Sequence, residues 1–183
     1  KHMGLGDDVC NFILNYRSND YDLSSEVIKP IDKVSDEDKI FYFEGSFKTM
    51  DGLWVIEVEE QTDFETSIKM DTVVWQRLYQ IIFRRVKRYL NINSNDLPAL
   101  VKLFTFIWSC EGYDYEIKEQ SDKEVIMNIT KCPYEKAMRR NPERREKIEA
   151  ICKEMCIPFY ESVLNDFNQN IELERKYFLS AGD

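Results

Sequence analysis

The segment YDYEIKEQSDKEVIMNIT, residues 113–130, decides the fold of this chain. Apolar and polar residues alternate in it on both sides of a turn signal at Ser121-Asp122. The alternating apolar residues are Tyr113, Tyr115, Ile117, Val125, Met127 and Ile129. A period of two residues is typical of half-buried strands, so we predict a β-hairpin.

Before the hairpin, apolar residues recur every three or four positions, which predicts three helices. The first is expected to start at Ser35, because acids follow it directly and favour a first helical turn. The second runs from about Asp63 and closes in residues 91–95, and the third runs from Asp96 to about Cys110. The expected core stripes are Phe43, Phe47, Met50, Trp54 and Val58; then Phe64, Ile68, Trp75, Leu78, Ile82, Val86 and Tyr89; then Leu97, Val101, Phe104 and Trp108.

After the hairpin, Asn141-Pro142 predicts a fourth helix, because a capping residue precedes a proline at the first helical position. This helix is expected to bury Ile148, Cys152, Met155 and Phe159. Pro158 should kink or end it. Residues 171–180 are predicted to form a strand with Leu173, Tyr177 and Leu179 on one side. Helices on one face of a small antiparallel sheet make an α+β fold.

The length of 183 residues and the hydrophobic content of 43% fit one domain of ordinary size. Residues 1–5 are interpreted as the remnant of a tag, because His-Met before a glycine is a usual expression-vector scar. Residues 6–17 are expected to form a strand or short helix and residues 18–34 a linker. Residues 35–183 then form a single α+β domain of ligand-binding type.

Charge and composition exclude several classes of partner. A net charge of −9 argues against nucleic acid, which needs a basic surface. No apolar run is long enough to span a membrane and no signal peptide is visible, so we expect a cytoplasmic protein with no membrane partner. The odd number of cysteines fits reduced thiols.

The single histidine, His2, falls within the interpreted tag. Its position excludes the Ser-His-Asp and Cys-His pairs, in which an imidazole accepts the proton. It also excludes zinc sites with histidine ligands. Any chemistry of this chain is therefore expected to proceed without an imidazole.

Charged residues interrupt the apolar stripes of the first two predicted helices. A buried carboxylate has to be paired or hydrogen-bonded, or its pKa rises. One interpretation is an internal Asp–Arg pair that fixes the helix register. The other is a polar anchor in an aromatic ligand pocket. The predicted ligand-binding residues are Asp51, Trp54, Asp71, Trp75, Arg85 and Trp108.

The cysteines allow two further hypotheses. Cys152 and Cys156 lie one helical turn apart, and with Cys132 they would supply three thiolates for a metal. The alternative is that they are small buried thiols of the core. Cys132 follows a strand and precedes a helix start, where the pKa of a thiol can be lowered, so it is the better placed for reactivity.

The run Asp51-Gly52-Leu53-Trp54, followed by Val58-Glu59, Asp71 and Val74-Trp75, resembles an uncharacterised prokaryotic family of cytosolic proteins. That family is similar to L-2-amino-thiazoline-4-carboxylic acid hydrolase-like proteins and to the 4-vinyl reductase, or hydrocarbon-binding, domain. The resemblance covers roughly residues 38–183. It implies a hairpin ending in Cys132-Pro133, a long helix and two closing strands.

The resemblance also implies a displaced strand. The turn between the closing strands usually reads Gly-Asp-x-x-Cys-x-Phe, and residues 6–12 are similar to it. We therefore expect residues 6–16 to be the last strand, paired beside residues 171–180 within the chain or swapped to another molecule. An amphipathic helix is the alternative.

Related sensor domains hold zinc with three cysteines and a glutamate. Only Cys152 and Cys10 match that ligand set, while Phe178 and Arg175 stand near the other two positions. We therefore expect no cofactor; zinc stays an alternative, with Cys10, Cys152 and Cys156 as the metal candidates.

Together, these patterns predict a protein that binds a small, largely apolar molecule, rather than an enzyme. The first alternative is a cysteine-dependent hydrolase of the L-2-amino-thiazoline-4-carboxylate type, with Cys132 or Cys152 as nucleophile and a carboxylate as base. The second is a subunit-interaction module. Each of these three functions is compatible with a homodimer.

Overall fold

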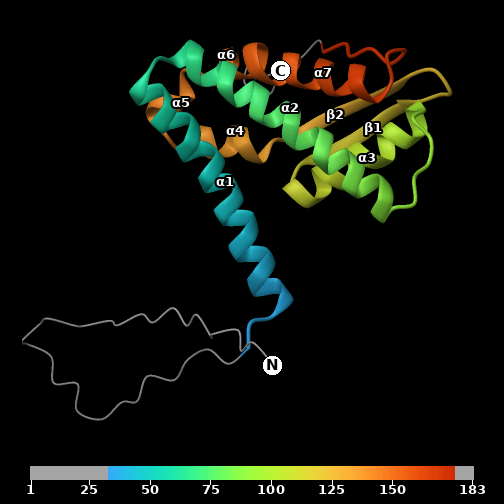
Figure 1. Cartoon of the computed structure of the whole chain (residues 1–183), viewed down its shortest axis with the longest axis horizontal. Helices are drawn as coiled ribbons and strands as arrows, with labels where there is room; N and C mark the ends of the chain where they lie inside the picture. The colour runs from blue at the N-terminus through green and yellow to red at the C-terminus, as the bar shows by residue number, and fades with distance from the viewer. Residues whose placement is uncertain (1–32, 176–183) are drawn as a thin grey trace, which may run out of the picture. The chain divides into compact units, whose positions relative to one another are not determined.

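The structure is a computed structural model that describes residues 33–175, and from Asp36 onward these residues belong to one compact unit. Three long helices come first: α1 (Asp36–Gln61), α2 (Phe64–Tyr89) and α3 (Leu97–Glu111). The hairpin of β1 (Asp114–Gln120) and β2 (Val125–Lys131) follows, then the short helices α4 (Pro133–Met138) and α5 (Pro142–Arg145). Helix α6 (Ile148–Ile151), the π-helical segment η1 (Cys152–Cys156) and α7 (Ile157–Phe167) form one continuous run (Figure 1). The predicted α+β class is confirmed.

Capping side chains set the helix starts where the sequence predicts them. Asp63 accepts a hydrogen bond of 2.7 Å from the backbone N–H of Thr66 at the start of α2. Asp96 does the same for Ala99 at the start of α3, over 2.9 Å. Each cap satisfies a backbone donor that has no partner within the helix.

The predicted hairpin is confirmed, and its register places the alternating residues opposite one another. Tyr115 faces Ile129 and Ile117 faces Met127 across the two antiparallel strands. The ring of Tyr115 lies 5.9 Å from that of Trp108, between centroids, so this face of the hairpin packs against α3.

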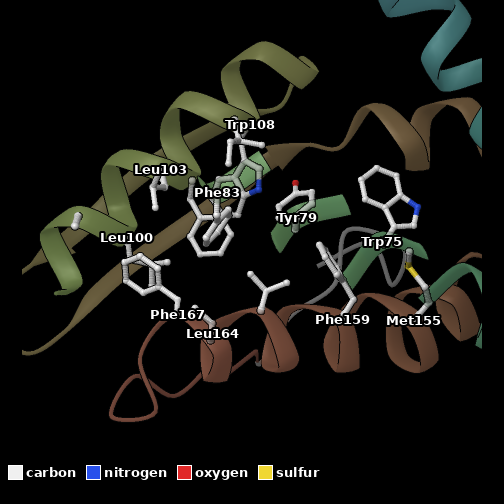
Figure 2. Packing of buried hydrophobic residues seen from close by; sticks show 14 of the residues in the cluster. Trp75, Tyr79, Phe83, Leu100, Leu103, Trp108, Met155, Phe159, Leu164 and Phe167 are labelled. Atoms are coloured by element: carbon white, nitrogen blue, oxygen red, sulfur yellow. The ribbon is translucent and has the colours of Figure 1, made fainter. Parts of the chain in front are cut away.

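The core is a row of apolar side chains shared by α2, α3 and the α6–η1–α7 run (Figure 2). The labelled residues are Trp75, Tyr79 and Phe83 from α2; Leu100, Leu103 and Trp108 from α3; and Met155, Phe159, Leu164 and Phe167 from η1 and α7. Truncating one such large side chain to alanine typically costs about 2–5 kcal/mol. The four predicted core residues of the last helix, Ile148, Cys152, Met155 and Phe159, are all buried.

Helix α1 differs from its prediction. It begins after Ser35 as expected, but none of its residues is buried. Phe43 is 65% exposed and Met50 is 70% exposed, so the predicted core stripe of α1 is wrong. Two features explain this difference. The N-terminal turns of α1 extend away from the other helices (Figure 1), and further along α1 the side chains of Met50 and Trp54 face solvent. Tyr89, expected inside α2, is exposed as well.

The end of the described chain also differs. Residues 171–175 are irregular rather than a strand, although Ile171 and Leu173 pack against the core. Residues 176–180, and the proposed strand, linker and tag within residues 1–32, lie outside the described residues. Pro158 does not end the last helix, because it falls in the first turn of α7 directly after η1.

Candidate functional site

A cavity of about 220 Å³ lies next to the first half of the aromatic row. Its walls come from α1, α2, α4, α5 and the α6–η1–α7 run. The apolar wall includes Val55, Ile68, Trp75, Met155 and Phe159. Cavities of about 150 Å³ already hold a benzene molecule, so this one has room for a slightly larger compound.

Two carboxylates of adjacent helices, Asp51 of α1 and Asp71 of α2, line this cavity. The indole N–H of Trp75 donates to Asp51 Oδ1 over 2.9 Å. Asp71 is only 5% exposed, and its Oδ1 has no hydrogen-bond partner among residues 33–175. The cavity therefore contains a buried acceptor that the described part of the protein does not satisfy.

Burial changes the proton affinity of both carboxylates. It raises the pKa of Asp51 to about 6, against a smaller opposing effect of the Trp75 hydrogen bond. Burial, and then the neighbouring charge of Asp51, raise the pKa of Asp71 to about 7, against a smaller opposing effect of a hydrogen bond with Trp75. Near neutral pH the pair is therefore poised between one and two negative charges.

A third carboxylate, Glu111, stands behind Tyr79. The Tyr79 hydroxyl lies 3.2 Å from each oxygen of Glu111 and donates to them. Burial raises the pKa of Glu111 to about 7, although Tyr79 and the charge of Lys48 oppose this rise. The sequence analysis missed Glu111; the available signal was an acid in the last turn of a helix, where the helix dipole disfavours negative charge.

The bases at the cavity already have acidic partners. Lys48 pairs with Glu44 one turn earlier on α1. Arg144, which is 8% exposed, lies 2.6 Å from Glu59 Oε2, and Lys147 also pairs with Glu59. Burial alone would raise the pKa of Glu59, but the hydrogen bond from Lys147 and the two positive charges lower it. Within the described residues no ion pair joins Asp51 or Asp71 to a base.

Three thiols, Cys132, Cys152 and Cys156, line the same cavity. Cys132 caps α4, where its Sγ accepts from the backbone N–H of Glu135 over 3.5 Å. Burial nevertheless raises the pKa of Cys132, so the expected lowering is wrong: the loss of solvent outweighs the cap. A hydrogen bond with Cys152, and then burial, raise the pKa of Cys156 well above its ordinary value.

The residues around these thiols do not form a metal centre. Across residues 33–175, no three His, Cys, Asp or Glu side chains are arranged to hold a metal ion. Cys10, the remaining metal candidate, lies outside the described residues.

Among the helices of residues 33–175, none combines the length and the apolar composition that a membrane span requires.

The model of one protein family matches residues 33–175, which include every element described above. The chain belongs to DUF6125, a family of unknown function. No curated protein and no solved structure matches the chain. The predicted similarity to hydrolase-like and hydrocarbon-binding domains stays a prediction.

In this DUF6125 chain the predicted ligand-binding residues divide into two groups. Asp51, Asp71 and Trp75 meet at the cavity. Trp54 is 47% exposed on α1, and Arg85 is exposed on α2. Within the described residues no ion pair joins Arg85 to Asp51 or Asp71, so the internal Asp–Arg pair is not formed. Trp108 is buried on the far side of Tyr79 from Trp75, and its indole N–H donates to Tyr160 over 3.2 Å (Figure 2).

The sequence analysis missed several tyrosines of the site. Tyr79, Tyr113, Tyr134 and Tyr160 line the cavity, and their positions looked like ordinary core or strand positions. The ring centroid of Tyr134 lies 5.4 Å from that of Trp75, and its buried hydroxyl has no hydrogen-bond partner within residues 33–175. Burial raises the pKa of Tyr134 and of Tyr160, so both keep their protons at neutral pH.

Proposed function

We propose that this chain binds a small, largely apolar molecule in the cavity between α1, α2 and η1. The observation that supports this most is the cavity of about 220 Å³ with the unsatisfied Oδ1 of Asp71 in its wall. This cavity is partly open to solvent beside the close-packed core, and its walls are mainly apolar, so a small molecule can enter it. A buried carboxylate oxygen without a partner costs free energy, and a bound molecule that donates to it would recover that cost.

The walls suggest how such a molecule would be held. Trp75, Met155 and Phe159 offer apolar contact, whose contribution grows with the apolar area that leaves water. The carboxylates of Asp51 and Asp71 fix the orientation of one polar end. A few polar groups in a mainly apolar pocket are the usual composition of a small-molecule site.

A π-helical segment in the wall supports the same proposal. Segment η1, Cys152–Cys156, interrupts an otherwise α-helical run where that run borders the cavity. Such bulges cost regular hydrogen bonding and occur often at functional sites. Here η1 directs the side chains of Cys152, Met155 and Cys156 to the cavity wall.

A cysteine-dependent hydrolase is the second candidate. The observation that favours it is that Cys132 and the two aspartates line one cavity. In this mechanism a carboxylate accepts the thiol proton and the Sγ attacks a carbonyl carbon. The bond from that carbon to the leaving nitrogen or oxygen then breaks as the carboxyl group returns the proton to it, and water later releases the acyl group from sulfur as a carboxylic acid. The raised pKa of Cys132 weighs against it, because less thiolate is then present at neutral pH. Complete protection of Cys132 and Cys152 from iodoacetamide in the folded protein would count heavily against this candidate.

Native mass spectrometry of freshly purified protein tests the binding proposal. The wild type is compared with Val55→Phe, which places a ring in the cavity, and with Leu53→Phe, a control on the exposed side of the same helix. We expect a co-purified mass on the wild type and on Leu53→Phe, and its loss in Val55→Phe. If the natural ligand is lost during purification, binding is measured instead as the rise in melting temperature on addition of benzene, phenol or indole.

Far-UV circular dichroism and a cooperative melting transition first establish that both variants fold. No co-purified mass, together with no thermal shift for any of the three compounds, would contradict the proposal. A mass that is retained equally by both variants would place the bound molecule elsewhere.

A further inference from the structure

We propose that the ligand of this cavity is a cationic amine with an apolar body, held by Asp51 and Asp71. This inference rests on the binding function proposed above and names its ligand class. Its starting point is the set of charged groups in the cavity wall: within the described residues neither aspartate forms an ion pair, whereas Lys48 and Arg144 each pair with a glutamate.

The first step concerns Asp71. Its side chain is more than nine-tenths buried, lines the cavity, and leaves Oδ1 without a hydrogen-bond partner in the described part of the chain. Once ionised, a carboxylate oxygen can only accept, so the partner that Oδ1 lacks in the ionised form is a donor. An ammonium group presents three donors and the opposite charge, which makes its hydrogen bonds to a carboxylate about twice as strong as neutral ones.

The second step concerns the charges that face the aspartates. Lys48 of α1 pairs with Glu44, and Arg144 of α5 pairs with Glu59, so each base already has an acidic partner. The charge of Lys48 also lowers the pKa of Glu111. Glu111 of α3 adds a third carboxylate behind Tyr79. Glu135 of the wall pairs with Arg139. Five further titratable groups of the wall keep their protons at pH 7, because their pKa values are all raised: Tyr113, Cys132, Tyr134, Cys156 and Tyr160.

The third step concerns proton affinity. Burial, and for Asp71 the charge of Asp51, raise the pKa of both aspartates into the neutral range. A bound cation opposes both causes, because it compensates the lost solvent and attracts both carboxylates. Since an alkylammonium ordinarily loses its proton only near pH 10, the ligand stays charged while the aspartates ionise beside it.

The fourth step concerns the rings. Trp75 is surrounded by Phe47, Tyr79, Tyr134 and Phe159, with ring centroids between 5.4 and 6.0 Å from its own. Aromatic rings next to carboxylates are a favourable environment for an organic cation, because the ring faces are electron-rich. The apolar remainder of the wall then accommodates the hydrocarbon part of the amine.

Isothermal titration calorimetry with three compounds of similar shape tests the inference. The compounds are 2-phenylethylamine, 2-phenylethanol and 3-phenylpropionate, which carry a cationic, a neutral and an anionic end. At pH 8 we expect the amine to bind about tenfold or more tightly than the alcohol, and the acid to bind least. At pH 5.5, where the aspartates hold protons, the preference for the amine should shrink.

Variants assign the preference to the proposed residues. Asp71→Asn should abolish the preference of the amine over the alcohol, whereas Glu57→Gln, a control on the exposed side of α1, should leave it unchanged. Asp51→Asn serves as a second variant if Asp71→Asn does not fold.

The outcomes separate this inference from the binding function. If the alcohol or the acid binds as tightly as the amine, the inference is overturned and the binding function stands. If the amine preference persists in both aspartate variants, the carboxylates do not hold the cation and the inference is again overturned. If no compound binds, the amine class is rejected, and the native mass spectra decide the binding function independently.

Discussion

Helices α1 and α2 are equal in length, at 26 residues each, and both present an aromatic stripe that contains an aspartate. Yet α2 buries seven side chains and α1 buries none. An apolar stripe shows that a helix face favours a partner, but it does not show that the same chain supplies one. For α2 the partners are α3 and the α6–η1–α7 run; for the stripe of α1 the described residues supply little beyond the contact between Phe47 and Trp75.

The face that α1 turns to the cavity is a different one. It consists of Lys48, Asp51, Gly52, Val55 and Ile56, which recur at helical spacing but include few large apolar side chains. On a helical projection Asp51 lies at the border with the stripe of Phe43, Phe47 and Trp54, whereas Gly52 and Ile56 lie on the opposite side of the helix from that stripe. The site is therefore built from the less apolar side of α1 and the more apolar side of α2.

The largest expected difference between the two helices is in stability. Trp75→Ala should lower the free energy of unfolding by about 3–5 kcal/mol, because Trp75 is 5% exposed and contacts four other rings. Trp54→Ala should change it by about 0.5–1 kcal/mol, because Trp54 is half-exposed. Urea denaturation measures both values. Similar losses for the two variants would show that the stripe of α1 is buried after all.

The next effect is a dependence of stability on pH that arises from the α2 side of the site. Burial and the charge of Asp51 raise the pKa of Asp71 from 3.8 to about 7 in the folded state. Between these pH values the folded protein binds the proton more tightly than the unfolded chain, so stability is lost as pH rises through this window and not beyond it. The raised pKa values of Asp51 and Glu111 act in the same direction.

Asp71→Asn isolates this effect, because an amide cannot ionise. Between pH 5 and pH 8 the variant should lose about 2–3 kcal/mol less stability than the wild type. Glu57→Gln on the exposed side of α1 should follow the wild type at every pH. Urea titrations at several pH values provide the comparison, and parallel curves for the wild type and Asp71→Asn would contradict the burial of an ionisable Asp71.

The smallest expected effects come from two glycines with opposite roles. Gly112 ends α3 with φ of +85°, and an added Cβ would lie 3.4 Å from Glu44 Oε1 of α1. Gly112→Ala should therefore cost about 1 kcal/mol. Gly45 lies inside α1 with no atom within 4 Å of a Cβ, so Gly45→Ala should stabilise by about 0.5–1 kcal/mol. Thermal unfolding measures both, and a loss for Gly45→Ala would mean that α1 has a neighbour at this position.

Local rules account for the parts of the fold that were predicted correctly. Alternation identified the hairpin, and the caps Asp63, Asp96 and Asn141 identified three helix starts, because these signals act within a few residues. The predicted strand at residues 171–180 came from the same alternation, yet residues 171–175 are irregular. An alternating segment forms a strand only beside another strand with which its backbone can hydrogen-bond, and the alternation does not show whether such a strand is present.

Local sequence signals also explain why only part of the site was predicted. Asp51, Asp71 and Trp75 stand out because a charge interrupts an apolar stripe, and all three line the cavity. Trp54 and Trp108 were grouped with them by residue type, but the distance between two stripes depends on how the helices cross. Tyr134 gave no local signal, and the signal of Glu111 was limited to its place in the last turn of a helix, since the burial of both results from contacts between segments far apart in sequence.

The most direct test of the ligand cavity uses the methionine methyl groups as reporters on both regions. Met138 and Met155 line the cavity, whereas Met50 and Met70 are exposed on α1 and α2. With ¹³C-methyl-methionine protein, addition of 2-phenylethylamine or 2-phenylethanol should shift the signals of Met138 and Met155 in a saturable manner and leave those of Met50 and Met70 in place. Unmoved signals of Met138 and Met155 with both compounds, or shifts confined to Met50 and Met70, would contradict a ligand site between α1, α2 and η1.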